Sequence, residues 1–205
     1  KRVMIICFEG ASAVGKTTLS RSLSAQFDII AEANQLFTRT GQEERMWYFH
    51  KQVERYQMAC QSTLPVILDC DVFQPLWYNW IYDYPKEFPS RAETHQFYRE
   101  QVEQGQIAFP DLYIIFYTTN KQLRQRKQKD ATRTRRNFEK HLQLIEPQKR
   151  YFQYLKSIGI AVEFIDYQDF DTTKTRVSNI IASQEASIRT PLEDFQKITA
   201  WLNSN

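Results

Sequence analysis

The stretch Gly10-Ala11-Ser12-Ala13-Val14-Gly15-Lys16-Thr17 follows a continuous apolar run from Val3 to Phe8. It matches the pattern G-x-x-x-x-G-K-[ST], which in known proteins lies between a buried strand and a helix. The apolar run predicts the strand, and a helix is expected from about Lys16 to Gln26 with Leu19 and Leu23 on its inner face. Both halves of the required context are therefore present.

This loop has the residue types that a triphosphate site requires. Glycines let the backbone turn so that successive N–H groups point inward, and the helix N-terminus adds partial positive charge. Lys16 would contact the β- and γ-phosphates, and the Thr17 hydroxyl would ligate Mg²⁺. We expect nucleotide binding by Gly10, Ala11, Ser12, Ala13, Val14, Gly15, Lys16, Thr17 and Thr18. The chain has only five glycines, and two of them fall in this motif, which argues against a chance match.

Further apolar runs predict four more strands. These runs are Phe27 to Ala31, Leu64 to Leu68, Asp111 to Tyr117 and Ala161 to Ile165. Helical patterns separate them, including a stripe at spacings of 3 and 4 that predicts a helix over residues 42–61: Met46, Phe49, Val53, Tyr56 and Cys60. Alternating strands and helices predict an α/β fold of three layers, with a five-stranded parallel sheet covered by helices on both faces.

The last helix is delimited by its N-terminal residues. Thr190 as N-cap, Pro191 in the first helical position and Glu193 three residues after the cap predict a capping box. Apolar residues follow at helical spacing: Leu192, Phe195, Ile198 and Leu202. We expect a C-terminal helix over about residues 190–203 that packs on the core.

The composition is typical of one cytoplasmic domain. The 205 residues, 42% hydrophobic and 25% charged, predict a single compact domain over residues 1–205. Cys7, Cys60 and Cys70 form no disulfide or zinc pattern, which favours a reducing compartment. The opening apolar run is far shorter than the ~20 residues of a membrane span, so no membrane partner is expected.

Positive charge is concentrated in one segment. The net charge is only +3, yet residues 121–136 hold eight Lys and Arg residues against the single Asp130. Such a local field favours one phosphate-bearing ligand over a long nucleic-acid track. A solvated helix face is the alternative explanation.

Other nucleotide-binding classes lack support. No glycine has an aspartate three residues before it, so the D-x-x-G of Ras-like GTPases is absent. Asn120-Lys121 imitates a guanine-binding N-K-x-D, but Leu123 stands where the acid should be. No two glycines are adjacent, which argues against a transporter-type ATPase.

Over most of residues 3–183 the chain resembles the P-loop nucleoside and nucleotide kinases, the group of thymidylate and deoxynucleoside kinases. The resemblance rests on Phe8-Glu9-Gly10 before the loop, Glu32 after the second strand, Val66-Ile67-Leu68-Asp69, and the cationic stretch before Phe138-Glu139-Lys140. It implies a transferase that uses ATP and Mg²⁺ to phosphorylate a small molecule.

The resemblance also implies roles for two acids. Asp69 should lie under the phosphate loop, close to Thr17 and the metal, although a strand-end cap is the alternative. Glu32 should act as general base toward a sugar hydroxyl, although an ordinary loop acid is the alternative. The family usually has Arg after the first acid, whereas this chain has Cys70, which puts a nucleotide acceptor in doubt and favours a neutral hydroxyl.

A lid over the transferred phosphoryl group is the third implication, at about residues 124–137. Arg124 and Arg126 would lie on the helix entering it, and Arg133, Arg135 and Arg136 in its loop; Arg126 and Arg133 are the first candidates for phosphate contact. An aromatic acceptor wall would follow the Asp69 strand, formed by Trp77, Tyr78, Trp80, Tyr82 and Tyr84. Helix packing explains Trp77 and Trp80 equally well.

The sequence thus predicts ATP-dependent phosphoryl transfer to a nucleoside or nucleotide. One alternative is a kinase of a non-nucleotide hydroxyl compound such as an antibiotic or cofactor precursor. A second is a regulatory or nucleic-acid-associated NTPase, although the acidic remainder of the surface disfavours nucleic acid. A homodimer is left open.

Overall fold

Five parallel strands form the centre of the molecule. The computed structural model describes residues 3–82, 88–129, 138–185 and 189–205. The strands are β1 (Ile5–Gly10), β2 (Asp28–Ile30), β3 (Val66–Asp69), β4 (Leu112–Tyr117) and β5 (Val162–Asp166). They lie in the order β2-β3-β1-β4-β5, and every neighbouring pair is parallel. The five expected strands are confirmed.

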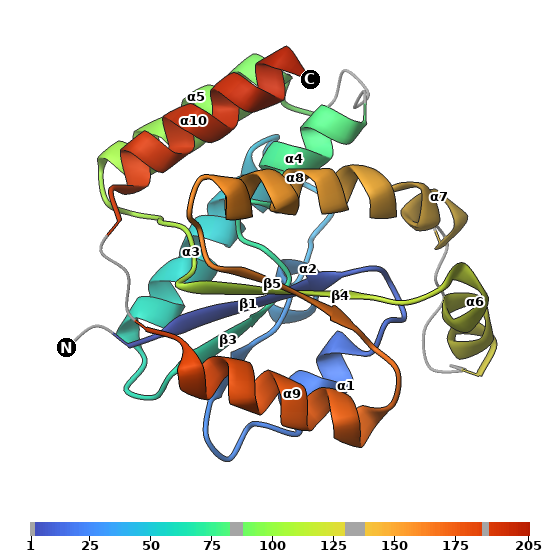
Figure 1. Cartoon of the computed structure of the whole chain (residues 1–205). Coiled ribbons are helices and arrows are strands. Elements are labelled where there is room, and N and C mark those ends of the chain that lie inside the picture. Colours follow the sequence, from blue (N-terminus) through green and yellow to red (C-terminus); the bar gives the residue numbers. More distant parts are fainter. Residues whose placement is uncertain (1–2, 83–87, 130–137, 186–188) are drawn as a thin grey trace.

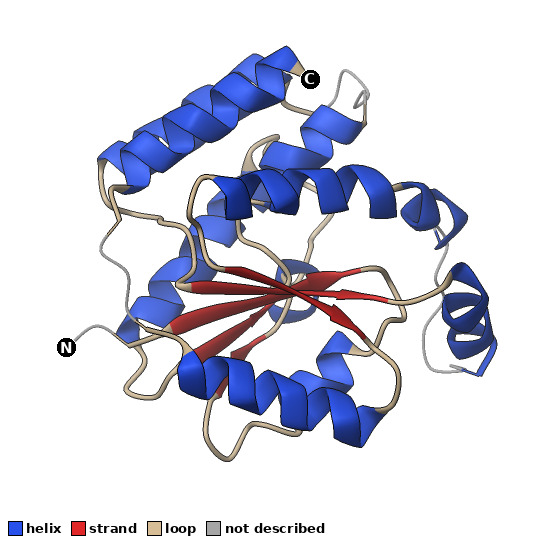
Figure 2. Cartoon of the chain, viewed as in Figure 1, coloured by secondary structure: helices blue, strands red, loops and turns tan. Residues whose placement is uncertain are grey.

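Helices cover the sheet on both faces. They are α1 (Lys16–Arg21), α2 (Ala33–Leu36), α3 (Trp47–Gln61), α4 (Gln74–Ile81), α5 (Arg91–Glu103), α6 (Asn120–Lys129), α7 (Phe138–Gln143), α8 (Ile145–Ser157), α9 (Phe170–Ser183) and α10 (Pro191–Ser204). Figure 1 shows α3, α4, α5, α8 and α10 on one side of the sheet and α1 and α9 on the other. The three layers are plain in Figure 2, where the strands lie between the two groups of helices.

Strand β1 shows why its apolar run is continuous. Ile5 and Cys7 pack into the core under α3, α4 and α8, whereas Ile6 and Phe8 pack into the opposite core. Leu19 and Leu23 join that second core, as their spacing predicts. A strand buried on both faces needs apolar side chains at every position, and the three-layer α/β fold is confirmed.

Helix α1 is shorter than expected. It ends at Arg21, and residues 22–26 continue as turns. The hydroxyls of Ser20 and Ser22 donate to the carbonyls of Thr17 and Leu19. Serine side chains compete in this way for backbone groups and weaken a helix, which apolar spacing alone does not show.

Helix α3 begins at Trp47, five residues later than expected, because the Glu43 carboxylate accepts from the N–H groups of Thr40 and Gly41 and fixes a turn there. Its buried face also differs, since Ala59 is buried and Cys60 is exposed. That face carries the polar Gln52 and Arg55, which a count of apolar residues leaves out.

The C-terminal helix is confirmed, but its capping box is wrong. Helix α10 follows Thr190 as N-cap, yet the threonine side chain makes no cap hydrogen bond. Arg189 instead pairs with Asp194 at 2.6 Å and secures the first turn. A capping box does form at α5, between Ser90 and Glu93. None of the helices in the described residues is both long and apolar enough to cross a bilayer.

Candidate active site

The phosphate loop connects β1 to α1, as the motif requires. A Cβ at Gly10, where φ is +139°, would lie 2.1 Å from the Phe116 carbonyl oxygen on the neighbouring strand. At Gly15, where φ is +114°, it would lie 2.9 Å from Cζ of Tyr167. Both positions thus need glycine on conformational and steric grounds. Residues 10–18 all line one cleft.

Lys16 lies within this loop. Its Nζ donates to the carbonyl oxygens of Gly10 at 2.7 Å and Ala11 at 3.4 Å. Burial opposes its charge, but Cys70 and the carboxylates of Glu9, Asp69 and Glu32 together raise the pKa of Lys16. The ammonium therefore stays charged at neutral pH, and phosphate oxygens, as charged acceptors, can replace the two carbonyls.

Asp69 lies beside the loop because β3 pairs with β1, with Asp69 opposite Phe8. The Thr17 hydroxyl donates to Asp69 Oδ2 at 2.7 Å. A hydroxyl and a carboxylate side by side are the oxygen donors that Mg²⁺ takes alongside phosphates and waters. The two residues therefore fit the expected metal site. No group of three or more His, Cys, Asp and Glu side chains in the described part of the chain could hold a metal ion.

Two buried acids, Glu9 and Asp71, lie behind Asp69, and neither has a role predicted from the sequence. Glu9 accepts from the N–H of Gly10 at 2.8 Å and of Asp71 at 2.9 Å, and burial raises its pKa. Asp71 accepts from the Phe73 N–H, the Trp77 indole and the Tyr113 hydroxyl, so it faces the core. Burial, with help from Glu9, raises the pKa of Asp71 to about 7. The signal that could have identified them in the sequence is their place, since each is an acid inside or just after a buried strand.

Glu32 lies where the sequence places it, between β2 and α2, with only Ala31 separating it from the strand. Its carboxylate does not cap α2; Oε1 accepts from Nε2 of Gln35 at 2.6 Å. The side chain lines the same cleft as the phosphate loop and Asp69. The fold thus brings Lys16, Thr17, Glu32 and Asp69 to one cleft at the carboxyl edge of the sheet, where ligands bind in open α/β folds.

The cleft measures about 1070 Å³ and continues past Glu32 to a second wall. Tyr48 donates to Gln74 Oε1 at 2.7 Å, and the Arg39 guanidinium lies 4.7 Å from the centre of the Trp47 ring. These four residues, with Tyr78, line that wall. Only Tyr78 among them was expected from the sequence, because the others, on α3, on α4 and in the segment before α3, belong to no recognisable motif.

The other expected wall residues have different positions. Trp77 is 1% exposed and packs in the core, and Trp80 packs against Trp201 at 5.1 Å between ring centres. Helix packing is therefore the correct explanation for both tryptophans. Tyr82 does not line the cleft, and Tyr84 lies outside the described residues.

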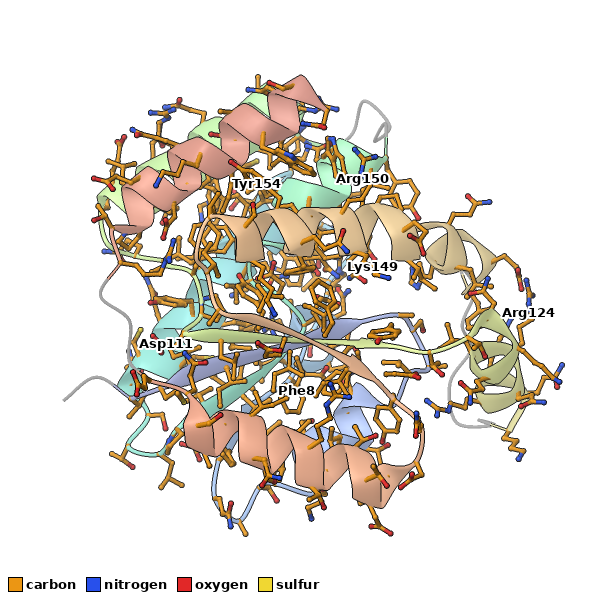
Figure 3. The ribbon with its side chains drawn as sticks, in the orientation of Figure 1. Phe8, Asp111, Arg124, Lys149, Arg150 and Tyr154 are labelled. Atoms are coloured by element: carbon orange, nitrogen blue, oxygen red, sulfur yellow. The ribbon has the colours of Figure 1, made fainter. Side chains whose placement is uncertain are left out.

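Arg126 is the lid candidate that the structure places at the cleft. It donates to the carbonyls of Val14 at 2.6 Å and Tyr167 at 3.0 Å, and its guanidinium stacks on the Tyr167 ring at 4.8 Å. Arg124 lies midway along α6, on the side away from the sheet (Figure 3), and pairs with Glu139. Arg133, Arg135 and Arg136, with most of the expected lid loop, lie outside the described residues.

Comparison with known proteins gives similarity in structure and none in sequence. No protein-family model matches the chain, and no curated protein matches it in sequence. A thymidylate kinase from Candida albicans is 18% identical and has a TM-score of 0.59, with 92% of this chain and 96% of that chain covered.

Two other solved structures are similar. Deoxyadenosine kinase from M. mycoides with bound dATP is 17% identical, with a TM-score of 0.64 and coverage of 88% of this chain and 100% of that chain. NadR protein in complex with NR is 16% identical, with a TM-score of 0.59 and coverage of 91% of this chain and 54% of that chain. The chain thus has the fold of the thymidylate and deoxynucleoside kinases, as its resemblance to them implied.

Proposed function

We propose that this protein is a Mg²⁺-dependent kinase that transfers the γ-phosphoryl group of ATP to a hydroxyl of a nucleoside or a similar small molecule. The observation that carries the proposal is one cleft that holds the phosphate loop, the Thr17–Asp69 pair and Glu32. Its fold is also that of enzymes that phosphorylate nucleosides and nucleotides. Fold alone does not assign a reaction, so the proposal rests on these residues.

The donor half of the site has a complete set of residues. Backbone N–H groups of residues 10–18 and the Lys16 ammonium would hold the phosphates, and Thr17 and Asp69 would hold Mg²⁺. When bound, Mg²⁺ neutralises charge on the β- and γ-phosphates. Arg126 would supply further positive charge, since its guanidinium already lies at Val14 in the loop.

Glu32 would act on the acceptor. Its carboxylate takes the proton of the acceptor hydroxyl as the oxygen forms a bond to the γ-phosphorus. The bond between that phosphorus and the β–γ bridging oxygen breaks, and ADP leaves with the bond's electron pair. A hydroxyl acceptor needs such a base, whereas an acceptor phosphate is already ionised.

The acceptor wall supports a ring-bearing substrate. Trp47, Tyr48 and Tyr78 offer flat apolar surface, and the Gln74 amide offers a hydrogen-bonding group beside it. Because Tyr48 donates to Oε1 of Gln74, the amide's Nε2 is left to donate to a ligand. Cys70 follows Asp69, so the side chain at this position supplies no cation for an acceptor phosphate. These features favour a nucleoside over a nucleotide.

A screen for acceptor-dependent ADP release tests the proposal. Nucleosides, nucleoside monophosphates and non-nucleotide hydroxyl compounds are each added with Mg²⁺-ATP, and Lys16→Ala serves as the inactive control. We expect at least one nucleoside to stimulate ADP release in the native protein and none in the variant. Acceptor-independent hydrolysis, together with steeply salt-dependent oligonucleotide binding, would favour the NTPase alternative.

A further inference from the structure

Sheet pairing stops just before the two acids of the proposed site. Strand β2 has only three residues, and its last partners in β3 are Ile30 and Leu68. Glu32 and Asp69 both lie beyond this last pair. On its other side Asp69 stands opposite Phe8 of β1, so the strand end is held there from one side only. The separation of the two acids therefore needs a support other than the sheet.

Arg55 of α3 provides that support. Its Nε donates to the Ala31 carbonyl at 2.8 Å, directly before Glu32. Its Nη2 donates to the carbonyl of Asp69 at 2.6 Å and of Cys70 at 3.1 Å. Nε and Nη2 form one edge of the planar guanidinium, so a single rigid group bridges the ends of β2 and β3.

The side chain that makes this bridge is itself held firmly. Arg55 is 0% exposed, and its Nη1 donates to Gln52 Oε1 at 2.6 Å. Gln52 lies one turn earlier on α3 and is 1% exposed. The guanidinium thus has a fixed orientation before it reaches either strand, which a flexible surface arginine would lack.

One of the bridged residues has an unfavourable backbone conformation. Cys70 has a φ of +74°, a left-handed value that costs a non-glycine residue free energy. Its N–H donates to the Phe8 carbonyl at 2.9 Å, and its own carbonyl accepts from Arg55. Strain of this kind persists only where the surroundings hold it, and Arg55 is one of the two groups that do so here.

Burying a cation in this position is costly. Its four hydrogen bonds all go to uncharged oxygens, and a buried charge without a paired ion is strongly disfavoured. An apolar side chain of similar volume often serves stability as well. Stability alone therefore gives little reason for an arginine here, whereas a bridge between two strand ends does.

We propose that Arg55 is a positioning residue that fixes the separation of Glu32 and Asp69 by joining the carboxyl ends of β2 and β3. The inference rests on the proposed function, since it assigns the two acids their roles. Misplacement of reacting groups by about 1 Å can cost on the order of 10²-fold in rate.

The test compares Arg55→Lys with Val53→Ala. Lysine keeps the charge, but its flexible ammonium lacks the rigid spacing of Nε and Nη2, so it does not hold the two strand ends at a fixed separation. Val53 lies on the same helix and packs in the core, so its truncation measures loss of packing alone. We expect Arg55→Lys to lower kcat about tenfold or more, with KM for the acceptor changed less than about threefold. Val53→Ala, assayed well below its Tm, should keep the native kcat.

A second measurement needs no acceptor. ATP affinity is measured by calorimetry with Mg²⁺ and with EDTA. Mg²⁺ should raise the ATP affinity of Arg55→Lys less than that of the native protein, because Asp69 is displaced. The ATP affinity measured in EDTA should be unchanged. If the native protein phosphorylates no acceptor, the kinase proposal fails, whereas this measurement still tests the position of Asp69.

Two results would overturn the inference. One is a folded Arg55→Lys protein that keeps the native kcat and the native increase in ATP affinity on adding Mg²⁺. The other is a Val53→Ala protein in which kcat and this increase fall as much as they do in Arg55→Lys. If Arg55→Lys does not fold, Gln52→Met takes its place, because it removes the hydrogen bond that orients Arg55. We then expect a smaller loss in the same direction, and native values contradict the proposal.

Discussion

The ring of Tyr167 lies so close to Gly15 that an added Cβ would come within 2.9 Å of its Cζ. Gly15→Ala therefore meets two obstacles, this ring and a φ of +114° that alanine disfavours. We expect ATP affinity to fall about tenfold or more, equivalent to about 1.4 kcal/mol, as the loop is displaced. Calorimetric titration with ATP measures it.

A second substitution separates the two obstacles. Tyr167→Ala removes the ring but leaves the backbone conformation of residue 15 as it is. Gly15→Ala should therefore lower ATP affinity less in the Tyr167→Ala background than in the native protein. Native affinity in the single Gly15→Ala protein would show that the loop binds ATP in another way.

Asp69→Asn tests the metal site. The asparagine can still accept from Thr17 through its side-chain oxygen, but the negative charge is lost. We expect activity to fall about 10- to 100-fold at fixed Mg²⁺, with partial recovery at high Mg²⁺. Activity measured against Mg²⁺ concentration checks this. An unchanged Mg²⁺ dependence would leave Asp69 as no more than a strand-end cap.

Glu32→Gln tests the proposed base. The amide cannot take the hydroxyl proton, so kcat should fall by about 10² while Mg²⁺-ATP binding stays native. Steady-state kinetics against acceptor concentration separates kcat from KM. A rise in KM with kcat unchanged would make Glu32 a binding residue.

Glu93 gives a prediction for stability in acid. Hydrogen bonds from Ser90 and from Arg45 lower the pKa of Glu93 to about 2 from its ordinary 4.5. A lowered pKa in the folded state contributes stability above the ordinary value and loses it as the pH falls through that range. The Tm difference between native protein and Glu93→Gln should thus be largest near pH 6 and shrink toward pH 2.

Thermal unfolding at several pH values measures this difference. Glu100→Gln, on the same helix but outside the Arg45 contact, controls for the loss of a surface carboxylate. A Tm difference for Glu93→Gln that stays constant over the acid range would contradict the prediction.

The sequence predicted those features that local patterns determine. Continuous apolar runs gave all five strands, and the phosphate-loop motif gave the position of Lys16 and Thr17. The position of Asp69 beside Thr17 was implied by the resemblance to the P-loop kinases, in which the strand that ends at this acid lies beside the first strand. The role of Asp69 in binding metal stays a prediction.

Features that depend on tertiary packing were not predictable. Arg55 and Gln52 lie on the buried face of α3, where a pattern of apolar residues assigns Cys60 instead. Arg39 and Trp47 belong to no motif, and only the fold shows that they line the same cleft as Gln74. The serine hydroxyls that end α1 early act on neighbouring residues of the sequence. Helix propensity still fails to predict their effect, because it does not measure how they compete for the backbone groups of the helix.

The position of Trp47 makes the molecule's own fluorescence a reporter of acceptor binding. Its ring lines the cleft beneath the Arg39 guanidinium, whereas Trp77 is enclosed in the core and Trp80 and Trp201 pack on each other. A ligand that displaces Arg39 changes the polarity around Trp47 directly, whereas Trp77, Trp80 and Trp201 do not line the cleft. Emission quenched or shifted on titration, and silent in Trp47→Phe, would identify acceptors without any turnover assay.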